Sequence, residues 1–521
     1  MSVGVIAPGR GSRSASERHR RRTGALVANP TFVGVAALTV LAALLRFYRL
    51  GHQGFWFDEA NTALLVHFSP GKMLGLVPQT ESTPPLYYCV AWVWARLFGY
   101  GEVALRSLSA VAGVLTVPVA YGAARKLISV RAGLIAAALT ACSPLLVWYS
   151  QEARSYALLV LLCAASLLAF AYVLERPTGR SVAAWVVCSA LALATHYYAV
   201  LAVVPEALWL LLVHRHSRAV QVGFGLVALC GMALIPLAIS QHGTGKGNWI
   251  SHAPLGRRTA EIFPQSAAGF QSVAYSVLEP LALALAILGL ALLAFRSDPE
   301  ERVGGLIAAL LAVAGLVLAF VLVAGGFDDL LTRNMLPIWM AVAVAVAGGF
   351  AARRARVPGL LAAVALCGIG VASTIGIATN SNYQRPDWRA VARVLGARPA
   401  AGDRAIVVQH YRDLLPLSLY LPGLRFSSRH GATVSTLDVV SFTSPQSAGF
   451  CWWGSACNLW PSRMQSSYAI PGFRPVWRRR VKQFTVLHMV ASRGRARVTP
   501  AAVSRALVTT RYRNDELLLQ R

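Results

Sequence analysis

Two adjacent carboxylates, Asp58 and Glu59, follow the first long apolar run of the chain almost at once. They come directly after three aromatic residues, Phe55, Trp56 and Phe57. A carboxylate enclosed by aromatic rings is partly removed from water, which raises its basicity and suits it to take a proton from a hydroxyl group. The same spacing also fits a simpler role, because an acidic residue at the start of a helix can cap free amide groups. Both residues are catalytic candidates, and we expect Asp58 to act while Glu59 supports it.

Further polar residues stand at the ends of later apolar runs. Glu152 and Arg154 lie in Y-S-Q-E-A-R-S-Y-A, and His196 interrupts a run at T-H-Y-Y. Arg333, in D-D-L-L-T-R-N, has the fork of donors that binds a phosphate group. Each has a structural alternative, respectively a juxtamembrane ion pair, a histidine satisfied at a helix break, and an interfacial anchor. Lys246 lies in a long loop that could cover a site, or it can simply be solvated.

The composition is that of a membrane protein with many spans. Of the 521 residues, 56% are hydrophobic and only 13% are charged, whereas soluble domains carry about 25% charged residues. The formal charge of +28 could attract nucleic acid. However, the basic residues lie mainly in short loops between apolar runs and in the last third of the chain. Because that is the pattern of membrane topology, nucleic acid is not expected as a partner.

Apolar runs long enough to span a membrane take about 20 residues each. About eleven such runs lie near residues 31–48, 104–124, 132–148, 155–174, 182–196, 197–213, 219–239, 274–295, 303–324, 334–350 and 358–378. The pair within 182–213 is one long run broken at T-H-Y-Y. Residues 84–98 are apolar but short, and we expect them to form an interfacial helix on the outer surface.

The loops between these runs alternate in charge. Six basic loops fall on one side if the amino terminus is cytoplasmic, which is the orientation that the positive-inside rule favours. The candidate residues named above then all lie on the opposite, extracytoplasmic side, as does everything after about residue 380. The sequence therefore predicts a multi-pass protein of the plasma membrane with its chemistry on the outer face.

Three regions are expected along the chain. Residues 1–30 form a basic cytoplasmic arm, residues 31–379 a transmembrane catalytic domain, and residues 380–521 an extracytoplasmic soluble domain. In the last region, the sequence pattern predicts an α/β domain, because the helical stretch D-W-R-A-V-A-R-V-L precedes strand-like runs such as R-A-I-V-V. Cys451 and Cys457 lie in it, and an oxidising compartment would permit a disulfide between them.

The sequence has none of the common motifs that bind a soluble nucleotide or a metal ion. A Walker sequence, a glycine-rich loop after a strand, H-E-x-x-H and paired C-x-x-C are all missing from the sequence. The cytoplasmic loops are too short for a nucleotide-binding domain. An enzyme of this kind needs an activated substrate that does not depend on cytosolic nucleotide, and a lipid carrier in the membrane meets that condition.

Taken together, these stretches resemble a known group of enzymes. The acidic pair, P-P-L-Y-Y, G-Y-G-E-V-A-L-R-S-L-S-A-V-A-G, Y-S-Q-E-A-R-S-Y-A-L-L, H-Y-Y and D-W-R-A-V-A-R-V-L are similar to stretches of GT-C fold glycosyltransferases. They look most like the family 39-related group, which includes protein O-mannosyltransferases and lipid A aminoarabinose transferases. The resemblance covers about residues 1–400. It implies a polytopic α-helical GT-C fold of about 11 transmembrane helices plus external juxtamembrane helices.

The resemblance also implies the chemistry. The donor would be a polyprenyl-phosphate-linked sugar, mannose or arabinose above others. The acceptor hydroxyl would belong to a cell-envelope glycan, a glycolipid or a protein on the extracytoplasmic face. Asp58 would deprotonate this hydroxyl while it attacks the anomeric carbon with inversion, and Arg333 and Arg154 would neutralise the departing lipid phosphate. A single displacement has the same physical requirement, namely a base on one side of the sugar and charge stabilisation on the other.

The motifs also supply the candidates for donor or acceptor binding, which are Glu152, Arg154, Tyr156, His196, Tyr197, Lys246 and Arg333. One departure concerns the residues before the double proline, where the aminoarabinose transferases carry an acidic-basic pair. This chain has Ser82 and Thr83 there, with Glu81 upstream, so that no lysine reaches the phosphate from this point. No cofactor is assigned. A divalent metal near Asp58, Glu59 and His196 is left open, because some branches of the family work without one.

Two other classes of protein compete with an enzyme. A transporter or flippase for lipid-linked sugars would explain the many spans and also Glu206, since a carboxylate within an apolar run is a functional suspect. However, the sequence shows no convincing internal repeat of the kind that many transporters have. A scaffold that binds anionic polymer through its basic tail would leave the acidic pair without a purpose.

Overall fold

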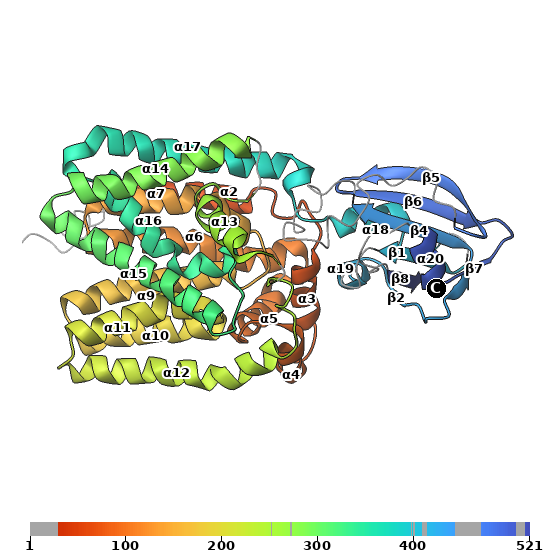
Figure 1. Cartoon of the computed structure of the whole chain (residues 1–521), viewed down its shortest axis with the longest axis horizontal. Helices are drawn as coiled ribbons and strands as arrows, with labels where there is room; N and C mark the ends of the chain where they lie inside the picture. Colours follow the sequence, from red (N-terminus) through yellow and green to blue (C-terminus); the bar gives the residue numbers. More distant parts are fainter. Residues whose placement is uncertain are drawn as a thin grey trace, which may run out of the picture.

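The computed structural model shows a bundle of long helices that is joined at one end to a β-sheet domain (Figure 1). It describes residues 30–251, 253–270, 274–397, 399, 402–408, 414–442, 470–506 and 516–520. The predicted basic arm, apart from its last residue, lies outside the described residues, and so do Cys451 and Cys457.

Within this described part, eight helices are long and apolar enough to cross a membrane. They are α2 (Pro30–Phe47), α6 (Glu102–Leu127), α9 (Tyr156–Glu175), α12 (Arg218–His242), α14 (Tyr275–Arg296), α15 (Pro299–Ala324), α16 (Leu336–Phe350) with the 3₁₀ turn η2 (Thr332–Met335) before it, and α17 (Arg356–Thr379) with η3 (Arg353–Ala355) before it. A ninth span results if the bent pair α7 (Val130–Cys142) and α8 (Pro144–Ser150) is counted as one. The chain is therefore a multi-pass integral membrane protein.

By this criterion, the described residues contain eight or nine of the roughly eleven predicted spans, and the two others are shorter apolar helices. The predicted spans at 182–196 and 197–213 are the shorter helices α10 (Gly179–Thr195) and α11 (Val200–Val213), which the turn η1 (Tyr197–Ala199) separates. At 1.5 Å per residue, α10 is about 26 Å long and α11 about 21 Å, less than the ~30 Å of a bilayer core. The predicted span at 132–148 bends by 57° between α7 and α8. Pro144 starts the second of these helices, and Ser143 caps it through the amide of Leu146.

The bundle holds a large cluster of buried, mostly small apolar residues, and close contacts between helix backbones accompany it. α16 lies at its centre, packed against α7, α9, α14 and α15. A Cβ on Gly349 would come within 1.7 Å of the carbonyl oxygen of Gly289, so α16 and α14 touch at glycine. Small residues serve this purpose in membranes because lipid tails are as apolar as leucine and burial of apolar surface drives nothing. Apolar side chains such as Leu44 and Phe295 are exposed on the outside.

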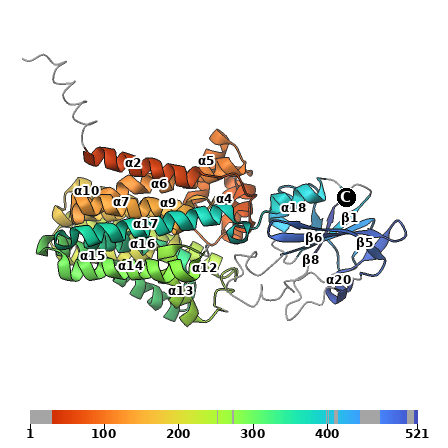
Figure 2. The same ribbon diagram turned by 90° about the horizontal axis from the view of Figure 1, so that it is seen from above.

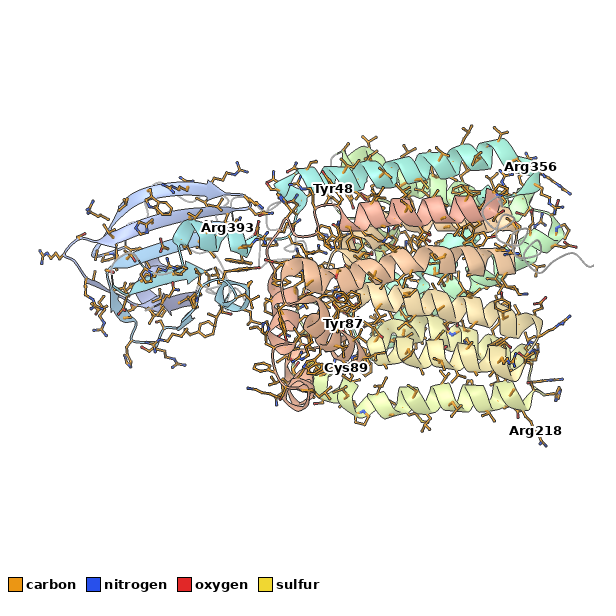
Figure 3. The ribbon with its side chains drawn as sticks, turned by 180° about the vertical axis from the view of Figure 1, so that it is seen from behind. Tyr48, Tyr87, Cys89, Arg218, Arg356 and Arg393 are labelled. Atoms are coloured by element: carbon orange, nitrogen blue, oxygen red, sulfur yellow. The ribbon has the colours of Figure 1, made fainter. Side chains whose placement is uncertain are left out.

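One end of the bundle carries the short helices α3 (Phe57–Leu65), α4 (Pro70–Thr80) and α5 (Leu86–Phe98), and this end faces the sheet domain (Figures 1 and 2). Arg218 and Arg356 mark the opposite end, whereas Tyr48, Tyr87 and Cys89 lie toward the sheet domain (Figure 3). α5 is too short to span, as predicted. However, Tyr87 and Tyr88 are buried against the bundle rather than placed at its surface.

Among the described residues, the main sheet of this domain has six strands in the order β2-β8-β1-β4-β6-β5. β3 and β7 form a second, two-stranded sheet. Their bounds are β1 (Arg404–Val408), β2 (Arg425–Phe426), β3 (Ala432–Val434), β4 (Thr436–Phe442), β5 (Phe473–Val481), β6 (Phe484–Ala491), β7 (Ala496–Val498) and β8 (Glu516–Gln520). β1 pairs with β4 in parallel, and the remaining pairs are antiparallel. Together with the helical bundle, this mixed sheet confirms the predicted fold class.

Helices cover the sheet and connect it to the bundle. α18 (Trp388–Leu395) and α19 (Leu414–Ser418) pack on one face, where Trp388 and Leu417 join Ile406 and Val408 of β1 in a buried cluster. The opposite face of β1 contributes Ala405 and Val407 to a second cluster, near α20 (Pro500–Ala506). Every residue of β1 is buried, as expected for an apolar strand at the centre of a sheet. α19 also packs against α3, which carries the acidic pair.

Candidate active site

The acidic pair lies in the first turn of α3, at the end of the bundle that faces the sheet domain. Trp56 is the N-cap residue of this helix, and no side chain caps it. The capping role considered for Asp58 and Glu59 is therefore not what the structure shows. The two carboxylates are neighbours in sequence, but they lie in different surroundings.

Glu59 is fully buried and held by Arg106 of α6. The guanidinium donates two hydrogen bonds to the carboxylate, from Nε to Oε1 at 2.7 Å and from Nη2 to Oε2 at 2.6 Å. The backbone N–H of Ala153 donates a third at 2.9 Å. Burial alone would raise the pKa of Glu59, but the charge and hydrogen bonds of Arg106 outweigh it and hold the pKa below its ordinary value. Glu59 is thus an ionised group with its bonding capacity already in use.

Asp58 is half-buried and only loosely paired. Its Oδ2 lies 3.8 Å from Nη1 of Arg333, and the two side chains are 23% and 25% exposed. Within the described part of the chain, the Asp58 carboxylate accepts no hydrogen bond from a side chain or an amide. Arg333 lies in η2, with its guanidinium 5.6 Å from the ring centre of Trp249. This pair is therefore reachable from outside and able to bond a ligand.

Arg154 holds the surroundings of this pair together. Its Nη1 donates to Oε2 of Glu81 at 2.8 Å and lies 3.3 Å from the backbone carbonyl of Asp58. Glu81 also accepts a hydrogen bond from Asn61 at 2.7 Å. The residue before the S-T-P-P stretch thus serves as the counterion of Arg154. Because Arg154 and Glu81 are both buried, Arg154 is already bonded within the protein.

Glu152 is buried beside the site and paired with Arg385. Nη2 of Arg385 donates to its Oε2 at 3.0 Å and to the carbonyl of Trp148 at 2.9 Å, and the guanidinium lies 3.9 Å from the centre of a Trp148 ring. Burial, with smaller contributions from the carboxylates of Glu59 and Asp58, raises the pKa of Glu152 to about 7, although Arg385 acts in the opposite direction. Sequence reasoning missed Arg385, which comes 233 residues after Glu152. Its only signal was its place two residues before D-W-R.

Aromatic rings form one wall of the site. The ring of Tyr156 lies 4.7 Å from that of Tyr149 and 5.6 Å from that of His196. His196 accepts a hydrogen bond at Nδ1 from the amide of Tyr198 at 3.2 Å. The positive charge of Arg333 interacts electrostatically with the side chains of Tyr149, Tyr156 and His196. The structure therefore brings together Asp58, Arg333 and His196 with Glu152, Arg154 and Tyr156, from four separated segments of the chain.

Two candidates lie apart from this group. The hydroxyl of Tyr197 donates to Gln241 of α12 at 2.8 Å. The ammonium of Lys246 bonds to the backbone carbonyl of Gln79 near the end of α4. Tyr197 thus ties η1 to α12, and Lys246 ties the loop after α12 to the end of α4.

The described residues contain no group of three or more histidine, cysteine, aspartate or glutamate side chains that could hold a metal ion. The three donors considered from the sequence, Asp58, Glu59 and His196, do not form such a group, since Glu59 is bonded to Arg106. The structure offers no set of protein ligands around Asp58 to which a divalent ion could be assigned.

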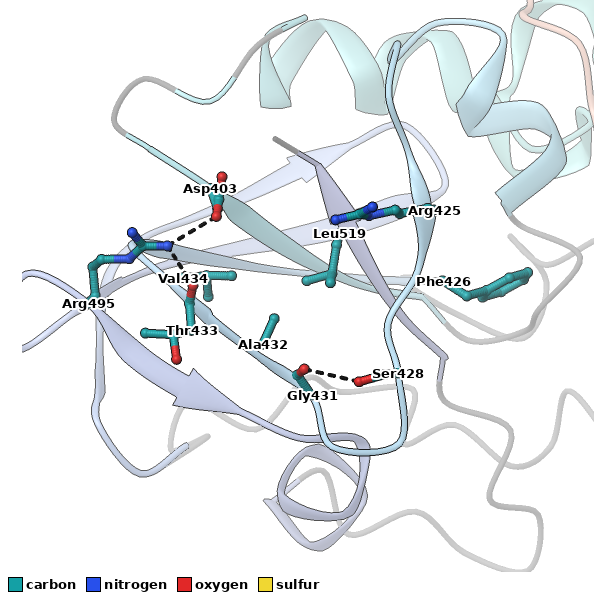
Figure 4. A pocket seen from close by; sticks show the side chains of 10 residues that line it. All are labelled: Asp403, Arg425, Phe426, Ser428, Gly431, Ala432, Thr433, Val434, Arg495 and Leu519. Carbon is teal, nitrogen blue, oxygen red and sulfur yellow. Dashed lines mark hydrogen bonds and ion pairs between the residues drawn. The ribbon is translucent and has the colours of Figure 1, made fainter.

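A cavity in the sheet domain lies apart from these residues. It occupies about 500 Å³ in the sheet domain and is lined by residues of β2, β3 and β8 together with the ion pair of Arg495 and Asp403 (Figure 4). None of the candidate residues lines it. Glu206 is also separate, because it is buried among α9, α10 and α11, where it accepts hydrogen bonds from Ser166 and from Trp185. The site around Asp58 is therefore selected by the chemistry of its side chains.

Comparison with known proteins supports the fold. Residues 82–239 match a family model described as dolichyl-phosphate-mannose-protein mannosyltransferase. No curated protein sequence is a significant match. The chain is similar to the apo structure of ArnT from Cupriavidus metallidurans, with 14% identity, a TM-score of 0.53, and coverage of 90% of this chain and 98% of that one.

Two further solved structures are similar at lower scores. ArnT from the same organism bound to undecaprenyl phosphate gives 15% identity and a TM-score of 0.49, with coverage of 89% of this chain and 98% of that one. The arabinofuranosyltransferase AftD from Mycobacteria gives 16% identity and a TM-score of 0.47, with coverage of 88% and 40%. The similarity to apo ArnT confirms the predicted GT-C fold, and the family match confirms the resemblance over the segment that contains Glu152, Arg154, Tyr156 and His196.

Proposed function

We propose that this chain is a membrane glycosyltransferase that moves a sugar from a polyprenyl-phosphate donor to an acceptor hydroxyl. The observation that carries the proposal is the loose pair of Asp58 and Arg333. In this pair, a carboxylate and a guanidinium with open bonding capacity lie 3.8 Å apart in a half-buried part of a GT-C fold. The family match over residues 82–239 supports the same class of donor.

The proposed reaction is a single displacement. Asp58 takes the proton of the acceptor hydroxyl, whose oxygen forms a bond to the anomeric carbon of the sugar. The bond between that carbon and the phosphate oxygen breaks, and its electron pair leaves with the lipid phosphate. Arg333 stabilises the charge that develops there, on the side of the sugar opposite to the base, so its 3.8 Å contact with Asp58 must open when the donor binds. Attack from the side opposite to the leaving group inverts the anomeric centre.

The surrounding residues prepare this step without entering it. Arg154 bonds to the carbonyl of Asp58 and to Glu81, so we assign it the positioning of α3 rather than a direct contact with phosphate. Tyr156 and His196 offer ring faces and polar edges to a sugar. Tyr197 and Lys246 shape the outer rim through α12 and α4.

The orientation in the membrane belongs to the same proposal. The acidic pair and the sheet domain share one end of the bundle, and Arg218 and Arg356 mark the other (Figure 3). Basic residues favour the cytoplasmic side. We therefore infer that Asp58 and the sheet domain lie outside the cell, where a lipid-linked donor can be used without nucleotide. Mannose or arabinose is the sugar that we expect, and the acceptor is a glycan, a glycolipid or a protein.

A transporter for lipid-linked sugars is the second candidate. Glu206 is the observation that favours it, because a buried carboxylate without a cationic partner among the described residues is unusual in a bundle of this kind. However, it is bonded to a hydroxyl and to an indole N–H, and it lies apart from Asp58 and Arg333. These bonds give it a structural role in joining three helices.

The test compares wild type with Asp58→Asn in proteoliposomes that contain polyprenyl phosphate carrying radiolabelled mannose or arabinose. Glu175→Gln is a matched control, since Glu175 is an exposed carboxylate whose one ion pair among the described residues is with Lys126. We expect release or transfer of sugar by wild type and by the control, but none by Asp58→Asn. An active Asp58→Asn variant would contradict the assignment of the base. Labelled lipid that crosses the bilayer with its sugar attached would support the transporter.

A further inference from the structure

In the loop that leads to Asp58, residues 51–56, backbone N–H and C=O groups are bonded by side chains from outside the loop. Its inner side is bonded to Arg106, which donates to the carbonyls of Leu50 at 3.0 Å, Gln53 at 2.9 Å and Gly54 at 2.9 Å. Arg106 is also the partner of Glu59. The inner side of the loop is thus tied to α6 within the bundle.

The outer side of the same loop is bonded by residues that come more than 300 positions later. Three side chains make these bonds: Asp387 accepts from the N–H of Gly54 at 2.9 Å, the hydroxyl of Tyr420 accepts from the N–H of Phe55 at 2.7 Å, and Arg389 donates to the carbonyl of Gly51 at 2.7 Å. Arg389 and Tyr420 share a second partner, Glu102, at the start of α6. The loop is therefore held between the bundle and the entrance to the sheet domain.

Gly54 makes this approach of two backbones possible. A Cβ at this position would lie 2.7 Å from Cβ of Arg389 and 2.9 Å from its backbone nitrogen. Backbone atoms cannot move aside as the end of a flexible side chain can. The contact of the loop with residues 387–389 is thus one that any larger residue at position 54 would disrupt.

The sheet domain holds these residues in turn. Lys482, at the turn between β5 and β6, forms an ion pair with Asp387. Its neighbour Gln483 donates to the carbonyls of Ser381 at 2.7 Å and of Arg385 at 3.0 Å. α18 begins directly after Asp387 and lies between the sheet and the bundle (Figures 1 and 2). A continuous chain of contacts therefore runs from the sheet to the loop.

We propose that residues 384–389 form a positioning segment through which the docked sheet domain fixes the place of Asp58. Asp387 and Arg389 hold the loop at positions four to seven residues before Asp58, and Arg385 holds Glu152 beside the site. Among the described residues, the one ion pair of the Asp58 carboxylate is the 3.8 Å contact with Arg333, so its place depends on the backbone that carries it. Asp387, Arg389 and Arg385 are positioning residues, and the inference rests on the proposed function.

The test measures turnover and amide exchange in the full-length protein. Asp387→Ala removes the acceptor for Gly54, whereas Asp387→Asn keeps an oxygen in the same place. Arg495→Ala is a control in the same domain, since it removes an exposed ion pair with Asp403 that touches neither the loop nor the segment. We expect Asp387→Ala to lower kcat roughly ten- to a hundredfold with a nearly unchanged KM for the donor, as a small misplacement of a catalytic group does. Asp387→Asn should recover most of the turnover.

Hydrogen exchange gives a second readout that does not need a substrate. The amides of Gly54 and Phe55 should exchange faster in Asp387→Ala than in wild type and in Arg495→Ala. If Asp387→Ala does not fold, Lys482→Met loosens Asp387 without removing the hydrogen bond, and a smaller change in the same direction is expected. Wild-type kcat and wild-type exchange in these variants would overturn the inference. A wild-type protein that transfers no sugar but shows the exchange pattern would contradict the proposed function alone.

Discussion

At the scale of single residues, Asp58 and Glu59 differ in what their carboxylates contact. Glu59 has a bidentate arginine and an amide, and it is fully buried. Asp58 has one distant cation and remains partly exposed. A carboxylate that must accept a proton from a substrate needs open bonding capacity, and Asp58 is the one that has it.

This difference predicts opposite effects on stability and turnover. Glu59→Gln leaves Arg106 buried without its counterion, which should lower the free energy of unfolding by about 3–5 kcal/mol. Asp58→Asn removes a long, partly exposed ion pair, and such a pair contributes about 0–1 kcal/mol. Thermal unfolding in detergent should therefore show a clear loss for Glu59→Gln and little for Asp58→Asn. Equal destabilisation by both substitutions would contradict the roles assigned here.

Glu152 makes a second prediction at this scale, in the dependence of stability on pH. Its folded pKa of about 7 lies above the ordinary value of 4.5. Between these two values the folded state binds the proton more tightly than the unfolded state, so stability falls as the pH rises through this window. Glu152→Gln cannot titrate. From pH 5 to pH 7, the Tm of wild type should thus fall more steeply than that of Glu152→Gln, and parallel curves would contradict the raised pKa.

At the scale of elements, buried ion pairs join helices that are distant in sequence. Arg154, just before α9, reaches Glu81 at the end of α4, and its bond to the carbonyl of Asp58 adds α3. A pair of this kind has a stabilising effect only while both partners are present, since each alone is a buried, uncompensated charge. The arrangement of the short helices thus depends on both residues together.

A double substitution tests this dependence. Arg154→Met leaves Glu81 buried without a counterion and should lower the free energy of unfolding by about 3–5 kcal/mol. The further substitution Glu81→Gln removes the stranded charge and should restore a large part of that loss. Thermal unfolding of the two single variants and the double variant measures the coupling. Additive losses would show that the two residues act independently.

The elements also show how far sequence reasoning reaches. Periodicity and hydrophobic length predicted the membrane helices, α18 and β1 because these depend on neighbouring residues. The chain breaks at His196 and bends at Ser143, and these local features shorten or divide the predicted spans. The length of an apolar run does not reveal them. Arg106 and Arg385 could not be assigned, since they meet Glu59 and Glu152 only after the chain has folded over 47 and 233 residues.

The site could be predicted in part for the same reason. The acidic pair was visible as a pattern, but the choice between its two members required knowledge of what each faces. Lys246 and Tyr197 are residue types that can bind a ligand, and they lie outside the predicted helices, yet they bond to Gln79 and Gln241 at the rim. Type and spacing thus indicate which residues can do chemistry, whereas three-dimensional contacts indicate which of them are free to do it.

At the scale of the whole molecule, the candidate site lies at one end of the bundle, and the basic residues that begin α12 and α17 lie at the other (Figure 3). The sheet domain and α3, with Asp58 and its partner Arg333, share one end (Figure 1), and Arg218 and Arg356 lie at the other (Figure 3). This separation indicates how the bundle is oriented in the membrane, because lysine and arginine near spans are retained on the cytoplasmic side. A lipid-linked donor held between helices would then present its sugar to the outer face.

Cysteine labelling in intact cells tests this direction. In a background without native cysteines, Arg493→Cys places a thiol in the exposed turn that follows β6, and Arg218→Cys places one at the opposite end of the bundle. A maleimide that cannot cross the membrane should label the first thiol in whole cells, and the second only after permeabilisation. The reverse pattern would place the sheet domain in the cytoplasm. A cytoplasmic site would be open to nucleotide-linked sugars, and the case for a polyprenyl-phosphate donor would lose its topological support.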